Sequence, residues 1–121
     1  MENVKIGFVG THGTGKTTSV YEMATALKKV AGLPNVGILV ETARGCPYPI
    51  NRETGVLSQE WLTINQTLSE HNMARSSPIL VCDRTVLDAM AYTLYAGLDE
   101  LYHALLPYAR HHAKSYRMLF L

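Results

Sequence analysis

The stretch GTHGTGKT, residues 10–17, lies between an apolar run, VKIGFV, and a run with helical periodicity. It satisfies the pattern G-x-x-x-x-G-K-[ST], which binds phosphate when a strand precedes it and a helix follows it. Glycines let successive backbone N–H groups point toward one anion, and the helix adds its partly positive N-terminus. We therefore expect a nucleotide-binding loop formed by Gly10, Thr11, His12, Gly13, Thr14, Gly15, Lys16, Thr17 and Thr18.

Two side chains of this loop have distinct expected roles. Lys16 would bring a full positive charge to the β and γ phosphates of ATP, and the Thr17 hydroxyl would be a ligand of Mg²⁺. His12 occupies a variable position of the pattern. It is either a solvent-facing filler or a catalytic group, and the sequence leaves both readings open.

The rest of the chain alternates between apolar runs and helical patterns. Residues 36–40, 79–82 and 118–121 are continuously apolar, which is typical of strands covered on both faces. A helix is expected from about 15 to 31, with an apolar stripe on one face made of Val20, Met23, Ala24, Leu27 and Ala31. Ser58 can cap a second helix that runs to about 75, and Thr85 and Asp88 make a capping-box-like pair for a third, from 85 to 96. A further helix is expected from 98 onward, where Pro107 either kinks the helix or opens a new one. This order predicts a parallel α/β sheet between two helical layers, with residues 42–57 as a long loop.

Polar side chains follow the second and third of these strands. Ligands of parallel sheets bind at the carboxyl ends of the strands, so we expect both groups to meet the phosphate loop there. Asp83 would hold Mg²⁺ with Thr17, or it would cap the next helix, a role that Thr85 can fill instead. Arg84 would bind phosphate or carboxylate, or pair with a neighbouring acid.

The stretch VETAR, residues 40–44, carries the second group. Glu41 could accept the proton of an acceptor hydroxyl during phosphoryl transfer, or it could simply pair with an arginine. Arg44 would bind the substrate or hold the loop in place. The catalytic set predicted from the sequence is therefore Lys16, Glu41, Asp83 and Arg84, with Arg44 added on the acceptor side.

Composition excludes several classes of protein. With 121 residues, the chain forms one domain. A net charge of +1 argues against nucleic-acid binding, two cysteines argue against a disulfide framework, and no apolar run is long enough for a membrane span. We expect a cytoplasmic protein without a membrane partner. Trp61 and Leu68 are expected in the core rather than as a platform on which a base stacks, and His111 and His112 are expected on a solvated helix face.

The segments GTHGTGKTT, VETAR, SQEW and CDRTVLDAMAY together resemble a family, the small P-loop NTPases of the AAA-like ATPase and kinase-like group. Similar proteins are the nucleoside and thymidylate kinases and the nucleoside-kinase domain of an NAD-biosynthesis regulator. The resemblance implies ATP and Mg²⁺ as cofactors, a three-layer α/β/α fold and the sheet order two-three-one-four-five. It also implies a glutamate base at Glu41 and an acidic residue with an arginine at Asp83 and Arg84.

The chain departs from this pattern at its end. Kinases of this kind continue beyond the fourth strand into an arginine-bearing lid, a fifth strand and an adenine loop, whereas this chain stops at Leu121. We expect residues 1–121 to be the N-terminal part of a longer kinase-like domain. An uncovered apolar sheet edge would then favour a homodimer.

Three functions remain after this reading. The first is an ATP-dependent kinase of a small acceptor, a nucleoside or nucleotide, and it gains from Glu41, Arg44 and the long loop. The second is an ATPase that hydrolyses ATP as a switch. The third is a nucleotide-binding module without catalysis.

Overall fold

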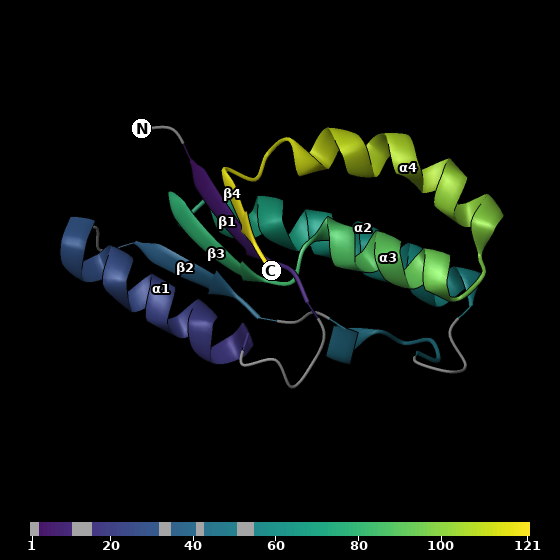
Figure 1. Ribbon diagram of the computed structural model, residues 1–121, viewed down its shortest axis with the longest axis horizontal. Helices are drawn as coiled ribbons and strands as arrows, with labels where there is room; N and C mark the ends of the chain where they lie inside the picture. Colours follow the sequence, from purple (N-terminus) through teal and green to yellow (C-terminus); the bar gives the residue numbers. More distant parts are fainter. Residues whose placement is uncertain (1–2, 11–15, 32–34, 41–42, 51–54) are drawn as a thin grey trace.

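The computed structural model describes residues 3–10, 16–31, 35–40, 43–50 and 55–121. Strands and helices alternate along most of the chain (Figure 1). In chain order they are β1 (Val4–Phe8), α1 (Lys16–Ala31), β2 (Val36–Leu39), the short 3-10 turn η1 (Ala43–Gly45), α2 (Val56–Ala74), β3 (Ile79–Asp83), α3 (Val86–Tyr95), α4 (Asp99–Ala113) and β4 (Met118–Phe120).

The strands form one parallel sheet in the order β2-β3-β1-β4. In the register, Phe8 at the end of β1 pairs with Asp83 at the end of β3, and with Phe120 of β4 on its other side. The predicted α/β class and parallel sheet are confirmed. The strand before the phosphate loop is central, as the resemblance implied.

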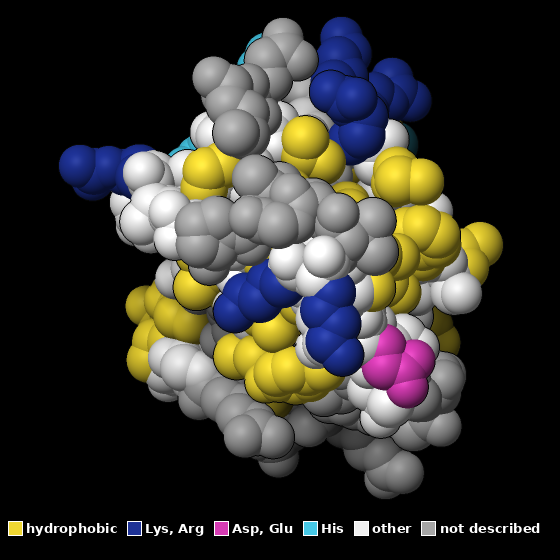
Figure 2. Space-filling view, turned by 90° about the vertical axis from the view of Figure 1, so that its left-hand side faces the viewer, with side chains coloured by type: hydrophobic (Ala, Val, Ile, Leu, Met, Phe, Trp, Pro, Cys, Tyr) yellow, Lys and Arg dark blue, Asp and Glu magenta, His cyan; other side chains and the backbone are white. Residues whose placement is uncertain are grey.

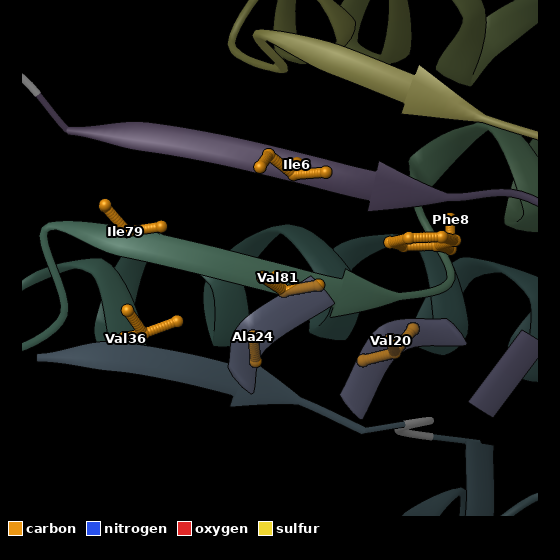
Figure 3. Close-up of a cluster of buried hydrophobic side chains, with 7 residues drawn as sticks. All are labelled: Ile6, Phe8, Val20, Ala24, Val36, Ile79 and Val81. Atoms are coloured by element: carbon orange, nitrogen blue, oxygen red, sulfur yellow. The ribbon is translucent and has the colours of Figure 1, made fainter. Parts of the chain in front are cut away.

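Helix α1 covers one face of the sheet through the apolar stripe that the sequence predicted. Val20 and Ala24 are buried against residues of β1, β2 and β3, and Met23 and Leu27 pack against the same cluster (Figure 3). The sheet contributes Ile6, Phe8, Val36, Ile79 and Val81. Burial of these apolar side chains, at about 25 cal/mol per Å² removed from water, fixes α1 on this face.

Helices α2, α3 and α4 lie on the opposite face, which completes the three layers (Figure 1). Leu39, Leu80 and Cys82 point to this side, and a second apolar cluster joins α3 to α4 through Val86, Met90, Ala109 and Tyr116. Pro107 lies inside α4, so it does not open a new helix. The helix expected from Ser58 begins two residues earlier, because Gly55 is its N-cap and donates its N–H to the Ser58 hydroxyl.

Helix α2 buries polar side chains and exposes apolar ones. Its buried residues are Ser58, Gln59, Thr63, Gln66, Thr67 and Glu70. Leu57, Ile64 and Leu68 face solvent, and Leu68 is 53% exposed. The prediction that Leu68 is a core residue is therefore wrong, and Trp61 is only half-buried. The inner face of α2 is polar because it meets charged groups of β1 and α4, described below.

Several basic side chains lie on the surface at the amino ends of the strands. Figure 2 shows lysine and arginine side chains at separate places on this face, among apolar side chains and an acidic one. Exposed basic residues end the helices there, among them Lys28, Lys29, Arg75 and Lys114. Cations at helix C-termini complement the negative end of the helix dipole, so these side chains are explained by local helix stability.

Two further features concern the predicted location of the protein and its predicted self-association. Among the residues that the structure describes, no helix is both long and apolar enough to cross a membrane. Met118 and Leu119 of the edge strand β4 are about half exposed, at 50% and 44%. The homodimer and the cytoplasmic location stay predictions.

Candidate phosphate site and acceptor pocket

The phosphate loop has the required context. Strand β1 ends at Phe8 and α1 begins at Lys16, so a strand precedes the motif and a helix follows it. Residues 11–15 lie outside the described part of the chain, as do the side chains of Lys16 and Thr17. Thr18, in the first turn of α1, is exposed.

Gly10 opens the loop in a conformation that favours glycine, with φ at 149°. Its N–H donates to Oδ1 of Asp88 at 3.0 Å. The second carboxylate oxygen of Asp88 accepts from the Thr85 N–H at 2.8 Å and lies 3.2 Å from the Thr85 hydroxyl. One carboxylate therefore joins the start of the phosphate loop to the start of α3.

Thr85 is the N-cap of α3, and its hydroxyl accepts from the Leu87 N–H at 3.1 Å. The capping box that the sequence indicated is present, with Asp88 as its second member. Asp83 is therefore not the cap. It is 6% exposed and ends β3 directly beside Phe8 of β1.

Arg84 follows with a positive φ of 99°. This conformation is uncommon in a residue other than glycine and costs on the order of 1–3 kcal/mol. The Arg84 N–H donates to the carbonyl of Phe8 at 3.0 Å, and its carbonyl accepts from Nε2 of Gln66 at 3.3 Å. The guanidinium carbon lies 5.7 Å from the centre of the Tyr92 ring, within the range of a cation–π contact.

Arg84 and Tyr92 belong to the wall of a pocket at this end of the sheet. The empty space of the pocket, including its open mouth, is about 370 Å³. The lining comes from η1, α2, the turn after β3, and α3, and consists of Ala43, Gln59, Leu62, Gln66, Arg84, Thr85, Asp88, Ala89 and Tyr92. Because Asp88 also bonds Gly10, the pocket adjoins the start of the phosphate loop.

Among the polar groups of this pocket, sequence reasoning named only Arg84 as a binding residue, and it identified Thr85 and Asp88 only as helix-capping residues. It did not single out Gln59, Gln66 or Tyr92 as binding residues. A signal was present, because Gln59 and Gln66 are two helical turns apart and share one face of α2. Gln59 is 2% exposed, and its side-chain oxygen accepts from the Thr93 hydroxyl at 3.3 Å.

The acceptor-side residues predicted after β2 are described only in part. Glu41 lies outside the described residues, and so does the side chain of Arg44. The backbone of Arg44 belongs to η1, and Ala43 of the same turn lines the pocket. Their roles stay predictions.

A second polar cluster lies next to the turn after β3, between β1, α2 and α4. The Glu70 side chain is fully buried, and its Oε1 lies 2.6 Å from Nζ of Lys5 and 2.7 Å from Nε2 of His112. Its Oε2 accepts from Nε2 of Gln66 at 2.7 Å and from the Tyr116 hydroxyl at 2.6 Å. Both carboxylate oxygens are thus saturated by donors.

The electrostatics of this cluster follow from those contacts. Burial would raise the pKa of Glu70, but hydrogen bonds from His112, Gln66, Lys5 and Tyr116 outweigh it and hold the pKa below its usual value. Burial, with the Glu70 charge nearby, raises the pKa of Cys82 and of Tyr116. Glu70 is therefore ionised, and the Tyr116 hydroxyl keeps its proton.

This cluster corrects the prediction for His112, which is 4% exposed rather than solvated. Its ring lies edge-on to those of His71 and Tyr116, in the space where α4 packs on α2. His111 is exposed as expected. The signal in the sequence was Lys5, a single charge inside an otherwise apolar strand, which requires a buried partner.

The residues present suit the Mg²⁺ that a phosphate loop implies. Mg²⁺ prefers oxygen ligands, and Asp83 supplies a carboxylate at the strand end next to β1. Within the described part of the chain, no three His, Cys, Asp or Glu side chains gather into a metal site of their own. The fit is that of an ion held mainly by phosphate and water, with Asp83 beside it.

Comparison with known families agrees with this geometry. A family model described as an AAA domain matches residues 5–121. The chain belongs to the AAA domain family. AAA domains are P-loop NTPases, a class that binds ATP with Mg²⁺, so the nucleotide-binding character of the chain is shown at the level of its family. Searches of curated proteins and of solved structures found no significant match to this AAA domain.

Proposed function

We propose that this AAA domain is an ATP-dependent kinase that transfers the γ-phosphoryl group of ATP to a small acceptor, a nucleoside or nucleotide. The observation that carries the proposal is the pocket beside the phosphate loop. Its wall includes Arg84, Gln59 and Tyr92, and Asp88 of the same wall accepts a hydrogen bond from Gly10, the residue that opens the loop.

The chemistry of the pocket lining suits such an acceptor. A guanidinium group binds phosphate or carboxylate oxygens through a planar fork, which favours an acceptor that carries or receives a phosphoryl group. The amide of Gln59 and the ring of Tyr92 add hydrogen-bonding and stacking surface beside it. A nucleoside presents hydroxyl, amide-like and aromatic groups, and it can use all three.

The proposed division of labour follows from the position of each residue. The phosphate loop with Lys16 holds the β and γ phosphates. Asp83 and Thr17 would hold Mg²⁺, and the ion would supply positive charge to neutralise the phosphates. Glu41 accepts the hydroxyl proton of the acceptor, and Arg84 stabilises charge on the transferred group. Phosphoryl transfer depends mainly on positioning and electrostatics, so these roles are sufficient.

ATP hydrolysis without an acceptor is the second candidate function, and the family description favours it. The two candidates differ in what controls ATP consumption. A kinase consumes ATP in proportion to acceptor and yields a phosphorylated product, whereas an ATPase releases inorganic phosphate at a rate independent of any acceptor.

The test measures ATP consumption, phosphate release and product formation with a panel of nucleosides and nucleotides. Ala89→Leu would fill the pocket, and Ala91→Leu on the exposed face of the same helix is the matched control. We expect Ala89→Leu to raise the acceptor KM at least tenfold and to leave the affinity for MgADP unchanged, with Ala91→Leu close to wild type. If the rate of phosphate release is the same with and without every acceptor and no phosphorylated product forms, the kinase proposal is wrong and the ATPase is favoured.

A further inference from the structure

A path of hydrogen bonds leads from the buried Glu70 carboxylate to the turn that carries Arg84. The Tyr116 hydroxyl donates to Oε2 of Glu70 at 2.6 Å and accepts from the Val86 N–H at 3.0 Å. Tyr116 follows α4, thirty residues beyond Val86. The phenol therefore connects two distant segments and uses its hydroxyl in both directions.

The Val86 N–H needs this partner because of its place in α3. Val86 is the first residue of the helix, where N–H groups have no acceptor within the helix. Thr85 serves the next two donors, since its hydroxyl accepts from Leu87 and its carbonyl from Asp88. Val86 is 0% exposed, so water does not reach it, and the Tyr116 hydroxyl is its acceptor.

Gln66 makes a second path from the same carboxylate. Its Nε2 donates to Oε2 of Glu70 at 2.7 Å and to the Arg84 carbonyl at 3.3 Å. The two paths reach the backbone on either side of Thr85. They converge on a turn whose first residue, Arg84, has a positive φ that its surroundings must maintain.

Gly7 of β1 allows the close packing that these contacts require. A methyl group at Gly7 would lie 2.5 Å from Cγ2 of Thr85 and 3.3 Å from the Tyr116 ring. Both side chains therefore rest on the bare backbone of the central strand. Lys5, two residues earlier, has its Nζ 4.4 Å from the centre of the Tyr116 ring and completes the packing around the phenol.

We propose that Tyr116 is a positioning residue, whose hydroxyl, oriented by Glu70, fixes the Arg84–Val86 turn and thereby the Arg84 guanidinium at the pocket. The part of this proposal that concerns catalysis by Arg84 rests on the proposed phosphoryl transfer. The part that concerns the conformation of the turn does not, because it follows from the hydrogen bonds of the Tyr116 hydroxyl to Val86 and Glu70.

The experiment compares Tyr116→Phe with Tyr108→Phe. Tyr108 lies on α4, and its hydroxyl donates to the Thr67 hydroxyl of α2 at 2.8 Å, so the control also breaks one hydrogen bond to α2 but reaches no part of the Arg84 turn. Both variants keep the aromatic ring. Three quantities are measured for each: backbone hydrogen exchange, kcat with the best acceptor, and the Kd for MgADP.

For Tyr116→Phe we expect at least tenfold faster exchange at the Val86 amide, at least tenfold lower kcat, and a Kd for MgADP within threefold of wild type. For Tyr108→Phe we expect wild-type exchange at Val86 and kcat within twofold. Unchanged exchange at Val86 in Tyr116→Phe would overturn the proposal, as would equal losses of kcat in the two variants. If the wild type phosphorylates no acceptor, the proposed function is wrong, and exchange at Val86 still decides whether Tyr116 holds the turn.

Discussion

Glu70→Gln tests whether the buried cluster is an ionised one. The substitution keeps the size of the side chain and removes its charge, which lies 2.6 Å from Nζ of Lys5 and 2.7 Å from Nε2 of His112. Lys5 would then lose its counter-ion while only 11% of its side chain is exposed. Breaking a buried pair by removing one partner costs about 3–5 kcal/mol, against a total stability of about 5–15 kcal/mol for a domain.

The assay is thermal and urea unfolding followed by circular dichroism. For a chain of 121 residues, each kcal/mol lowers Tm by about 4 °C, so we expect a decrease of about 12–20 °C. Glu60→Gln is the matched control, because it makes the same chemical change on the exposed face of the same helix. Its effect should stay within about 0.5 kcal/mol.

A double variant separates the loss of charge from the loss of shape. If the unpaired Lys5 ammonium causes the instability, Lys5→Met in the Glu70→Gln background should recover about 1–3 kcal/mol, because the uncompensated charge is gone. A loss below about 1 kcal/mol in Glu70→Gln, or no recovery in the double variant, would refute the ionised cluster.

Four further outcomes are expected. Folding lowers the pKa of Glu70, so its ionised carboxylate stabilises the folded protein fully above the unfolded pKa of about 4.3. This stabilisation is lost as pH falls through the lower folded pKa. In urea titrations from pH 6 to 3, the free energy of unfolding should fall with pH in the wild type and fall less steeply in Glu70→Gln. Thr85→Ala should cost about 0.5–2 kcal/mol in urea unfolding, through the lost cap of α3. Gly7→Ala should cost about 1–3 kcal/mol in the same assay, because the added methyl meets Thr85. Lys16→Ala should weaken ATP binding by about 1.5–3 kcal/mol in calorimetry, with unfolding unchanged.

The sequence was sufficient for the fold because local patterns and global topology agree. Apolar runs predicted all four strands, the first of them interrupted only by Lys5, and the stripe of Val20, Met23, Ala24 and Leu27 predicted how α1 packs. The capping pair of Thr85 and Asp88 was also readable, since the two residues are three positions apart. These features depend on spacing within one segment.

The pocket and the buried cluster depend on contacts between distant segments, and periodicity does not report those. Glu70 meets Lys5 and His112 across separations of 65 and 42 residues. Apolar side chains of a helix usually face the core, and this rule predicted that Leu68 of α2 is buried, whereas it is exposed. The charged interior beside α2 becomes visible only when β1, α2 and α4 are packed together, because each contributes one of Lys5, Glu70 and His112.

The strand order has a consequence for how the chain acquires its structure during synthesis. β1 and β2 leave the ribosome before β3, yet they do not pair with each other, and both pair with β3. Among the four described strands, no ladder can form until residues 79–83 emerge, and β1 gains its second neighbour only with residues 118–120. Until then the apolar edges of two strands stay open, and contacts of such long sequence separation form slowly. β3 is therefore the strand on which the sheet must nucleate, and a pause in translation before Ile79 would prolong the exposure of both earlier strands.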